Sequence, residues 1–278
     1  MELSKGGQGS NLQVRVIKML KIAVMIKQVP DSQDISIDPV TKTLNRSIAR
    51  NVVNPPDVNA TEAAIQLKNK YGGEITAITM GPPMADTALL QLMGMGVDNG
   101  ILVTDRVFAG ADTWPTAFTL ASVADYLGGF DVIFCGEETT DSSTGHVGPG
   151  IAEFLGCEQA TYVHKVEYDD GYFIVTRDIE GAEETIRIGK PAVITITLNA
   201  NEPRNPTLKR KIEAYKKGIR VVTNKELQLD PMCIGLKGSP TIVKDMKTVP
   251  DPVKNPSKLG VEDLDKLVSV LVEKGVVK

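Results

Sequence analysis

The stretch GEETTDSSTGHVGPG, residues 136–150, concentrates small groups that can bind an anion. Its hydroxyls and backbone N–H groups could donate to phosphate, and Gly145 and Gly148 would let the backbone approach closely. Asp141 could instead fix a ribose hydroxyl or an adenine amino group, or cap the turn. Because the pattern is neither a P-loop nor GxGxxG, a long surface loop with helix-capping residues is the alternative to a nucleotide site.

Other turn-forming segments lie near the ends of apolar runs: KQVPD at 27–31, NVVNPPD at 51–57 and TMGPP at 79–83. Asn54 and Asp57 could cap the helix that follows them. Met80 with Gly81 could form a wall against a base. Several such motifs at one edge are hard to explain as independent turns, so we expect them to share one site.

The elements that must position these residues alternate along the chain. Apolar runs predict strands at 21–29, 74–80, 100–105 and 131–136. Amphipathic patterns with capping residues predict helices from about 57 to 73 and at 83–96, 112–129 and 146–156. This alternation predicts an α/β fold, a doubly wound, mostly parallel sheet with helices on both faces. Ligands of such sheets bind beyond the carboxyl ends of the strands, where residues 136–150 lie.

The pattern changes beyond residue 158. Alternating segments separated by DDG (169–171) and EGAE (180–183) predict an antiparallel extension, with KPAVITITL (190–198) as a further buried strand. A basic helix, a Pro-rich tract at 231–256 and a final amphipathic helix follow. We therefore expect a polar tail at 1–19, a nucleotide-binding domain at 20–200, and a partner-recognition loop, arm and helix at 201–278.

Composition excludes several classes of protein. A net charge of −4 argues against nucleic-acid binding, which needs a basic face. No apolar run is long enough to span a membrane. The three cysteines are far apart, which predicts neither a disulfide framework nor a metal site and suggests a reducing, cytoplasmic compartment. We find no nucleophile and base pair that would predict a catalytic centre.

Six segments together resemble the β subunit of electron transfer flavoprotein, the family that includes the Fix-type subunits. The segments are VMIKQVPD (24–31), VNPPDVNATEAA (53–64), residues 80–113, GEETTDSSTGHVGPGIAEFLG (136–156), residues 175–208 and GLKGSP (235–240). The family signature is met by Val175, Arg177, Glu180, Gly181, Glu184 and Pro191. Ala182 departs from it, since the family usually has Gly or an acidic residue in this turn.

The resemblance implies a heterodimer with a larger α subunit that carries FAD on a mobile domain. It also implies a nucleotide site in this chain that holds AMP in simple carriers and a second FAD in electron-bifurcating members. The matching site residues are Met25, Lys27, Asn54, Pro55, Pro56, Asp57, Met80, Gly81, Glu138, Thr139, Thr140, Asp141, Ser142, Ser143, Thr144, Gly145, His146, Val147, Gly148 and Pro149. The matching partner-recognition loop is Leu198, Asn199, Ala200, Asn201, Glu202, Pro203 and Arg204.

The resemblance favours the bifurcating branch of the family, because Thr140 and Ser142–Ser143 stand in place of bulkier acidic residues. The expected function is electron transfer between a dehydrogenase or NADH and ferredoxin-like or quinone-reducing partners, as part of a flavoprotein oxidoreductase complex if the chain bifurcates. Association with a membrane through such a partner stays open. The alternatives are a simple carrier with AMP in this site, a stand-alone nucleotide-binding α/β domain, and a structural subunit with a degenerate site.

Overall fold

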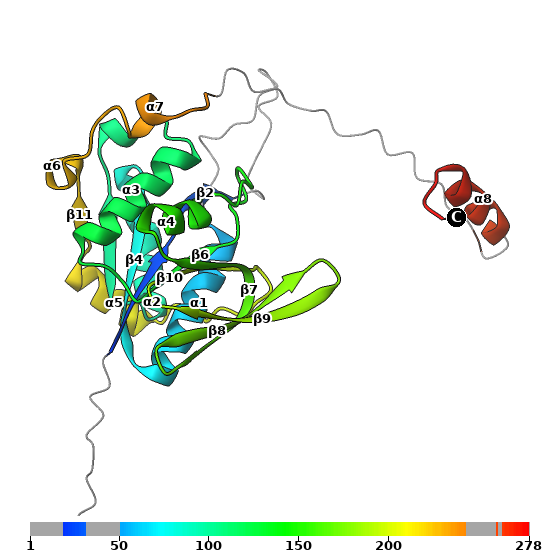
Figure 1. Cartoon of the computed structure of the whole chain (residues 1–278), viewed down its shortest axis with the longest axis horizontal. Coiled ribbons are helices and arrows are strands. Elements are labelled where there is room, and N and C mark those ends of the chain that lie inside the picture. Colours follow the sequence, from blue (N-terminus) through cyan, green and yellow to red (C-terminus); the bar gives the residue numbers. More distant parts are fainter. Residues whose placement is uncertain (1–18, 32–50, 243–259, 261–262, 278) are drawn as a thin grey trace, which may run out of the picture. The chain divides into compact units, whose positions relative to one another are not determined.

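The structure is a computed structural model that describes residues 19–31, 51–242, 260 and 263–277 (Figure 1). The chain divides into two compact units, residues 1–242 and 243–278, and each is described by itself. Within the described residues, no helix is both long and apolar enough to cross a membrane. Almost all of the predicted polar tail, and the part of the Pro-rich tract from residue 243 onward, lie outside the described residues.

A nine-stranded sheet forms the centre of the first unit, in the order β11-β5-β4-β1-β6-β10-β7-β8-β9. Pairing is parallel from β11 to β7 and antiparallel from β7 to β9. The parallel strands are β1 (Leu20–Met25), β4 (Gly73–Met80), β5 (Asn99–Val103), β6 (Val132–Gly136), β10 (Ala192–Ile196) and β11 (Arg220–Val222). The predicted α/β class with a mostly parallel sheet is confirmed. β11 was not expected, because three residues between a basic helix and a polar turn carry too weak a pattern.

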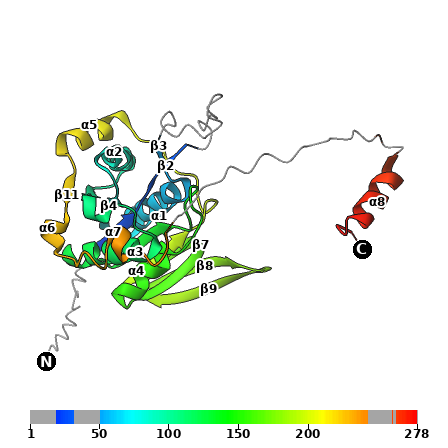
Figure 2. The same ribbon diagram turned by 90° about the horizontal axis from the view of Figure 1, so that it is seen from above.

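Helices cover both faces of this sheet, as Figure 2 shows from above. α1 (Pro55–Tyr71), α2 (Asp86–Met95) and α5 (Leu208–Lys217) pack on one face, and α3 (Thr113–Tyr126) and α4 (Val147–Leu155) on the other. In β1, Ile22 and Val24 belong to the first core, whereas Ala23 and Met25 belong to the second. Burial on both faces explains why this strand is a continuous apolar run rather than an alternating one.

The strand order reverses between β1 and β6. From β1 the chain moves outward through β4 to β5, and then returns to β6 on the other side of β1. The segments that leave β1 and β6 therefore diverge to opposite faces, which opens a crevice at their carboxyl ends. Residues 26–30 and 137–146 border this switch point.

The first predicted strand, 21–29, is divided in the structure. β1 ends at Met25, and β2 (Gln28–Pro30) pairs instead with β3 (Asn51–Val53) in a small antiparallel sheet. The backbone N–H of Lys27 donates to the Asp57 carboxylate at 2.7 Å rather than to a neighbouring strand. The Asp57 carboxylate thus takes the place of a strand partner for Lys27, and the chain leaves the main sheet after β1.

Local sequence signals account for several element boundaries. Asp112 caps α3 by accepting a hydrogen bond from the Trp114 N–H at 3.0 Å. α1 begins at Pro55, two residues before the predicted start, because a proline in the first turn needs no hydrogen-bond partner for its nitrogen. The described residues also form the short helices η2 (Pro83–Ala85), η3 (Arg106–Phe108), α6 (Asn224–Leu227) and α7 (Gly235–Gly238).

The antiparallel extension consists of β7 (Glu158–Asp169), β8 (Tyr172–Ile179) and β9 (Ala182–Gly189). Gly171 and Gly181 have positive φ at the two predicted turns. Arg177 and Glu184 are directly opposite each other and form an ion pair, and the Arg187 guanidinium lies 3.6 Å from the centre of the Tyr172 ring. Both arginines are thus engaged within the hairpin.

The second unit contains α8 (Leu264–Glu273), which matches the predicted final helix. None of its residues is buried, and Leu264, Val268 and Val272 are half exposed or more. The predicted apolar stripe is therefore uncovered by the part of this unit that the structure describes.

Candidate functional site

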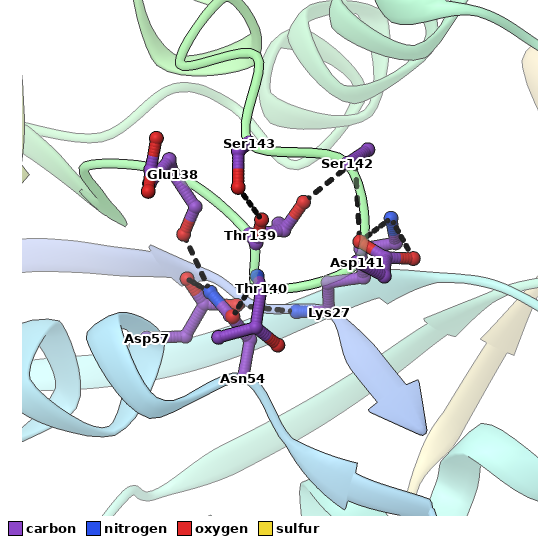
Figure 3. A network of polar contacts seen from close by, with 9 residues as sticks. All are labelled: Lys27, Asn54, Asp57, Glu138, Thr139, Thr140, Asp141, Ser142 and Ser143. Carbon is purple, nitrogen blue, oxygen red and sulfur yellow. Dashed lines mark hydrogen bonds and ion pairs between the residues drawn. The ribbon is translucent and has the colours of Figure 1, made fainter. Parts of the chain in front are cut away.

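The switch point brings together residues that are up to 114 positions apart in the chain. Lys27 follows β1, Asn54 and Asp57 stand at the start of α1, and the loop 137–146 follows β6 (Figure 3). Hydrogen bonds and ion pairs join all three segments. These predicted site residues therefore form one continuous polar network.

Asn54 holds the loop in place with its side-chain amide. Its Nδ2 donates to the Glu138 carbonyl oxygen at 2.8 Å, and its Oδ1 accepts from the Thr140 N–H at 3.1 Å. Asn54 is fully buried and occupies the N-cap position of α1, but its side chain makes no capping hydrogen bond. The capping role considered for it is therefore wrong, and the side chain binds the loop instead.

Asp57 lies in the first turn of α1 and is almost completely buried, with 4 % of its surface exposed. Its carboxylate accepts hydrogen bonds from the Lys27 N–H at 2.7 Å, the Gly136 N–H at 3.1 Å and Asn54 Nδ2 at 3.0 Å. It thus ties the ends of β1 and β6 to the helix. This carboxylate positions the backbone of the site rather than capping a helix.

Burial raises the pKa of Asp57 to about 7, against the lowering effect of its three hydrogen bonds. A carboxyl group that holds its proton more tightly when folded favours folding at low pH, and this contribution is lost as pH rises from 3.8 to about 7. We expect the difference in unfolding free energy between the wild type and Asp57→Asn to fall by on the order of 4 kcal/mol over that range and then level off. Denaturant unfolding of both proteins at several pH values between 4 and 8 measures this difference. A difference that stays constant would mean that the Asp57 pKa is not raised.

Lys27 supplies a cation to the site. Its Nζ lies 2.7 Å from both carboxylate oxygens of Asp141. Burial acts to raise the pKa of Asp141, but hydrogen bonds from Lys27, Thr139 and Ser142 outweigh it and lower the pKa. The lysine and the loop carboxylate therefore form a partly exposed ion pair over the crevice.

Within the loop, Thr139 organises the turn. Its carbonyl oxygen accepts from the Ser143 N–H at 2.7 Å and the Ser143 hydroxyl at 3.1 Å, and its own hydroxyl contacts the Ser142 hydroxyl at 2.8 Å. Thr140 and Thr144 are exposed. The loop is thus internally braced, while several of its hydroxyls face solvent.

The loop leads into the amino terminus of α4. His146 occupies the N-cap position and is exposed, and its side chain makes no capping hydrogen bond. Uncapped N–H groups at such a terminus favour an anion. Together with Lys27 and the loop hydroxyls, these donors fit the phosphate of a nucleotide.

The two loop glycines have different roles. Gly145 has a φ of +64°, which other residues rarely adopt, and a Cβ there would lie 3.4 Å from the Glu137 carbonyl oxygen. Gly148 is buried, and a Cβ there would lie 2.6 Å from Thr195 Cγ2. Gly148 therefore allows α4 to pack closely on β10, which the anion-binding interpretation of this glycine did not include.

The other predicted residues border the network at the strand ends. Met25 is buried in the core beneath α3 and α4, and Met80 packs against the same core. Gly81 donates its N–H to the Val103 carbonyl oxygen at 3.0 Å. Pro55 is exposed and Pro56 is buried at the start of α1.

Gly136 and Glu137, at the junction of β6 and the loop, are not among the predicted site residues, although both contribute to the site. A Cβ on Gly136 would lie 2.3 Å from Asp57 Oδ1 and 2.8 Å from Pro56 Cβ, so only glycine fits where β6 meets α1. Glu137 Oε1 accepts from the Leu198 N–H at 3.0 Å. A glycine at the end of a buried strand was a usable signal for Gly136. No local sequence signal indicates the contact between Glu137 and Leu198, which are 61 positions apart.

The predicted partner-recognition loop, 198–204, contacts α1 one to two turns beyond Asn54, which binds the loop 137–146. Asn59 and Asn201 exchange hydrogen bonds at 2.8 and 3.0 Å, and the Arg204 guanidinium forms a bidentate pair with Glu62 at 2.8 Å. Leu198 is 48 % exposed. The loop is thus held against α1 by hydrogen bonds, while the Leu198 side chain is exposed to solvent.

A hollow of about 500 Å³ lies at the opposite, amino-terminal end of the parallel strands. Two of its cations already have partners. Lys217 donates to the Asp98 carbonyl oxygen and to Asn99, and Arg220 donates to the Tyr126 hydroxyl. Lys27 at the switch point is paired as well, so the choice rests on position: ligands of such sheets bind at the carboxyl ends of the strands, which makes the switch point the stronger candidate.

Comparison with known proteins supports this assignment of the fold. Residues 41–227 match the model of the electron transfer flavoprotein domain. The chain is 44 % identical over 225 residues to the electron transfer flavoprotein subunit beta of Thermoanaerobacterium thermosaccharolyticum, covering 81 % of this chain and 86 % of the relative. It is 40 % identical to the protein FixA of Azorhizobium caulinodans, covering 81 % and 83 %.

A third relative matches over its whole length. The caffeyl-CoA reductase-Etf complex subunit CarD of Acetobacterium woodii is 34 % identical over 264 residues, covering 93 % of this chain and all of the relative. The domain match and these identities over most of each chain agree. The chain therefore belongs to the electron transfer flavoprotein family, as a β subunit.

Proposed function

We propose that FAD binds at the switch point of this β subunit and that the chain takes part in flavin-based electron bifurcation with an α subunit. Electrons would pass from a dehydrogenase or NADH to ferredoxin-like or quinone-reducing acceptors. The observation that carries the proposal is the network of Lys27, Asn54 and Asp57, which holds a hydroxyl-rich loop beneath an uncapped helix terminus.

A bound flavin would supply the redox chemistry, while the protein binds and orients it. In this chain, the α4 terminus and Lys27 would neutralise a diphosphate, and the loop hydroxyls would donate to its oxygens. Asp57 and Asn54 would keep these donors in place through their hydrogen bonds to Lys27 and to the loop. The hydroxyl side chains of Thr139, Thr140, Ser142, Ser143 and Thr144 are small, which favours a ligand larger than one phosphate.

The relatives add support for bifurcation. Similar chains include a FixA protein and a subunit of a caffeyl-CoA reductase-Etf complex. The α subunit that the family implies would pack on the uncovered apolar stripe of α8, and the exposed Leu198 would anchor a redox partner. Cys135, Cys157 and Cys233 are all free thiols, which fits the proposed cytoplasmic location.

Cofactor quantification in the purified α/β complex tests the proposal. We expect close to two flavins per heterodimer and direct reduction by NADH. One flavin with one AMP, and no reaction with NADH, would mean a simple electron carrier. Absence of any nucleotide beyond the α-subunit flavin would remove the site from the switch point.

Gly145→Val should empty the β site while the α-subunit FAD stays bound. Valine would be strained at a φ of +64°, and its branched side chain would push against the Glu137 carbonyl. We expect the β-site nucleotide content to fall at least about tenfold, which corresponds to about 1.4 kcal/mol of binding free energy. Gly156→Val is the matched control, because Gly156 has a φ of +59° at the far end of α4 with open space around it. Equal nucleotide loss in both variants would point to a general folding defect.

A further inference from the structure

Glu137 connects two loops: residues 137–146, which form the proposed nucleotide loop, and residues 198–204, which form the proposed recognition loop. Its backbone N–H donates to the Ile196 carbonyl oxygen at 3.0 Å, which extends the pairing of β6 with β10 by one residue. Its side chain reaches across to the Leu198 N–H at 3.0 Å. The first residue of the nucleotide loop therefore holds the first residue of the recognition loop.

A second connection between the same loops runs through α1. Asn54, at its start, binds the nucleotide loop through the Glu138 carbonyl and the Thr140 N–H. Asn59 and Glu62, on the next turns, bind Asn201 and Arg204 of the recognition loop. A single helix thus carries both loops.

These contacts close into a ring. Glu137 connects the nucleotide loop to Leu198, the first residue of the recognition loop. At the other end of the recognition loop, Arg204 binds Glu62 on α1. Asn54, at the start of α1, closes the ring by binding the nucleotide loop. Glu62 is almost completely buried, and its pKa is lowered because hydrogen bonds from Arg204 outweigh the effect of burial. The α1 side of the ring is therefore firmly held. The Glu137–Leu198 side consists of one hydrogen bond between partly exposed groups.

We propose that Glu137 is a positioning residue that couples the nucleotide site to the recognition loop. A nucleotide that contacts residues 138–145 would stabilise the loop in this arrangement and so hold Glu137 in the position from which it fixes Leu198. The ordered recognition loop would in turn favour nucleotide binding by the same factor, since coupling between two sites is reciprocal. The inference rests on the proposed nucleotide function of the switch point.

Hydrogen exchange of the purified α/β complex tests this coupling without a redox partner. After removal of the β-site nucleotide, AMP and FAD are added separately as probes, and exchange is followed in the peptide that covers residues 197–204. We expect either nucleotide to slow the exchange of the Leu198 amide about fivefold in the wild type, a value at the low end of known couplings. In Glu137→Ala this protection should disappear, and the dissociation constant of the same nucleotide should rise by a similar factor.

Two controls separate positioning from loss of charge or of folding. Glu137→Gln keeps a side-chain oxygen that can accept from the Leu198 N–H, so it should retain most of the protection. Glu153→Ala removes a carboxylate from an exposed position on α4 and should behave like the wild type.

Several results would overturn the coupling. It is wrong if AMP or FAD binds but leaves the exchange of residues 197–204 unchanged, or if Glu137→Ala keeps the wild-type protection. It is also wrong if Glu137→Gln and Glu153→Ala lose as much as Glu137→Ala. If neither AMP nor FAD binds to the wild-type complex, the proposed nucleotide function is wrong, and the coupling is wrong with it.

Discussion

Gly136→Ala should destabilise the protein by about 3 kcal/mol and abolish nucleotide binding at the switch point. A Cβ at this position would lie 2.3 Å from Asp57 Oδ1, 2.8 Å from Pro56 Cβ and 2.9 Å from the Asp57 nitrogen. Two of these contacts involve helix atoms that have little freedom to move. α1 would have to shift away from β6, and the hydrogen bond from the Gly136 N–H to Asp57 would break.

Denaturant unfolding and nucleotide content of the α/β complex measure this effect. Gly189→Ala is the matched control, because it adds the same methyl group to a strand glycine whose nearest neighbour would lie at 3.6 Å. That variant should change stability by less than about 1 kcal/mol. If Gly136→Ala behaved like Gly189→Ala, the close approach of α1 to β6 would not be a requirement of the fold.

Arg204→Met should cost about 2–3 kcal/mol of stability at neutral pH, because it leaves the Glu62 carboxylate buried without its cation. Only 5 % of the Glu62 side chain is exposed, whereas a third of the Arg204 side chain is in contact with solvent. Solvent screening of the exposed arginine places the expected loss at the low end of the range for broken buried pairs.

The pH dependence of this loss gives a second measurement. In the wild type the Glu62 pKa is lowered, so the pair contributes fully above the ordinary value of 4.5 and is lost as pH falls through the folded pKa. Without Arg204, burial would raise the Glu62 pKa, and the variant would regain stability relative to the wild type on acidification. Arg210→Met serves as the control, because Arg210 donates to the Met95 carbonyl rather than to a carboxylate. A loss independent of pH would attribute the effect to packing alone.

Both predictions concern the same helix, because α1 carries the nucleotide loop at its start and the recognition loop farther along. Gly136→Ala acts where the helix meets β6, and Arg204→Met acts where it holds the recognition loop. If the proposed coupling through Glu137 holds, Arg204→Met should also weaken nucleotide binding, although Arg204 lies outside the nucleotide site.

The sequence by itself determined the α/β class, the order of the main elements and the position of the loop at 136–150. These features depend on local signals: apolar runs buried on both faces, Asp112 as a helix cap, and Gly171 and Gly181 at the hairpin turns. Each signal acts within a few residues of the chain, so its meaning does not depend on the rest of the fold.

Only the tertiary structure decided what the polar residues of the site do. In sequence, Asp57 and Asn54 have the pattern of helix caps, and no local signal indicates a partner for Glu137 or Glu62. The order of the strands places β1 beside β6 and α1 between the two loops, which buries Asp57 and brings Glu62 to Arg204 across 142 positions. Burial turns a side chain that water would satisfy into one that needs a specific partner, and that partner is chosen by the packing of distant segments.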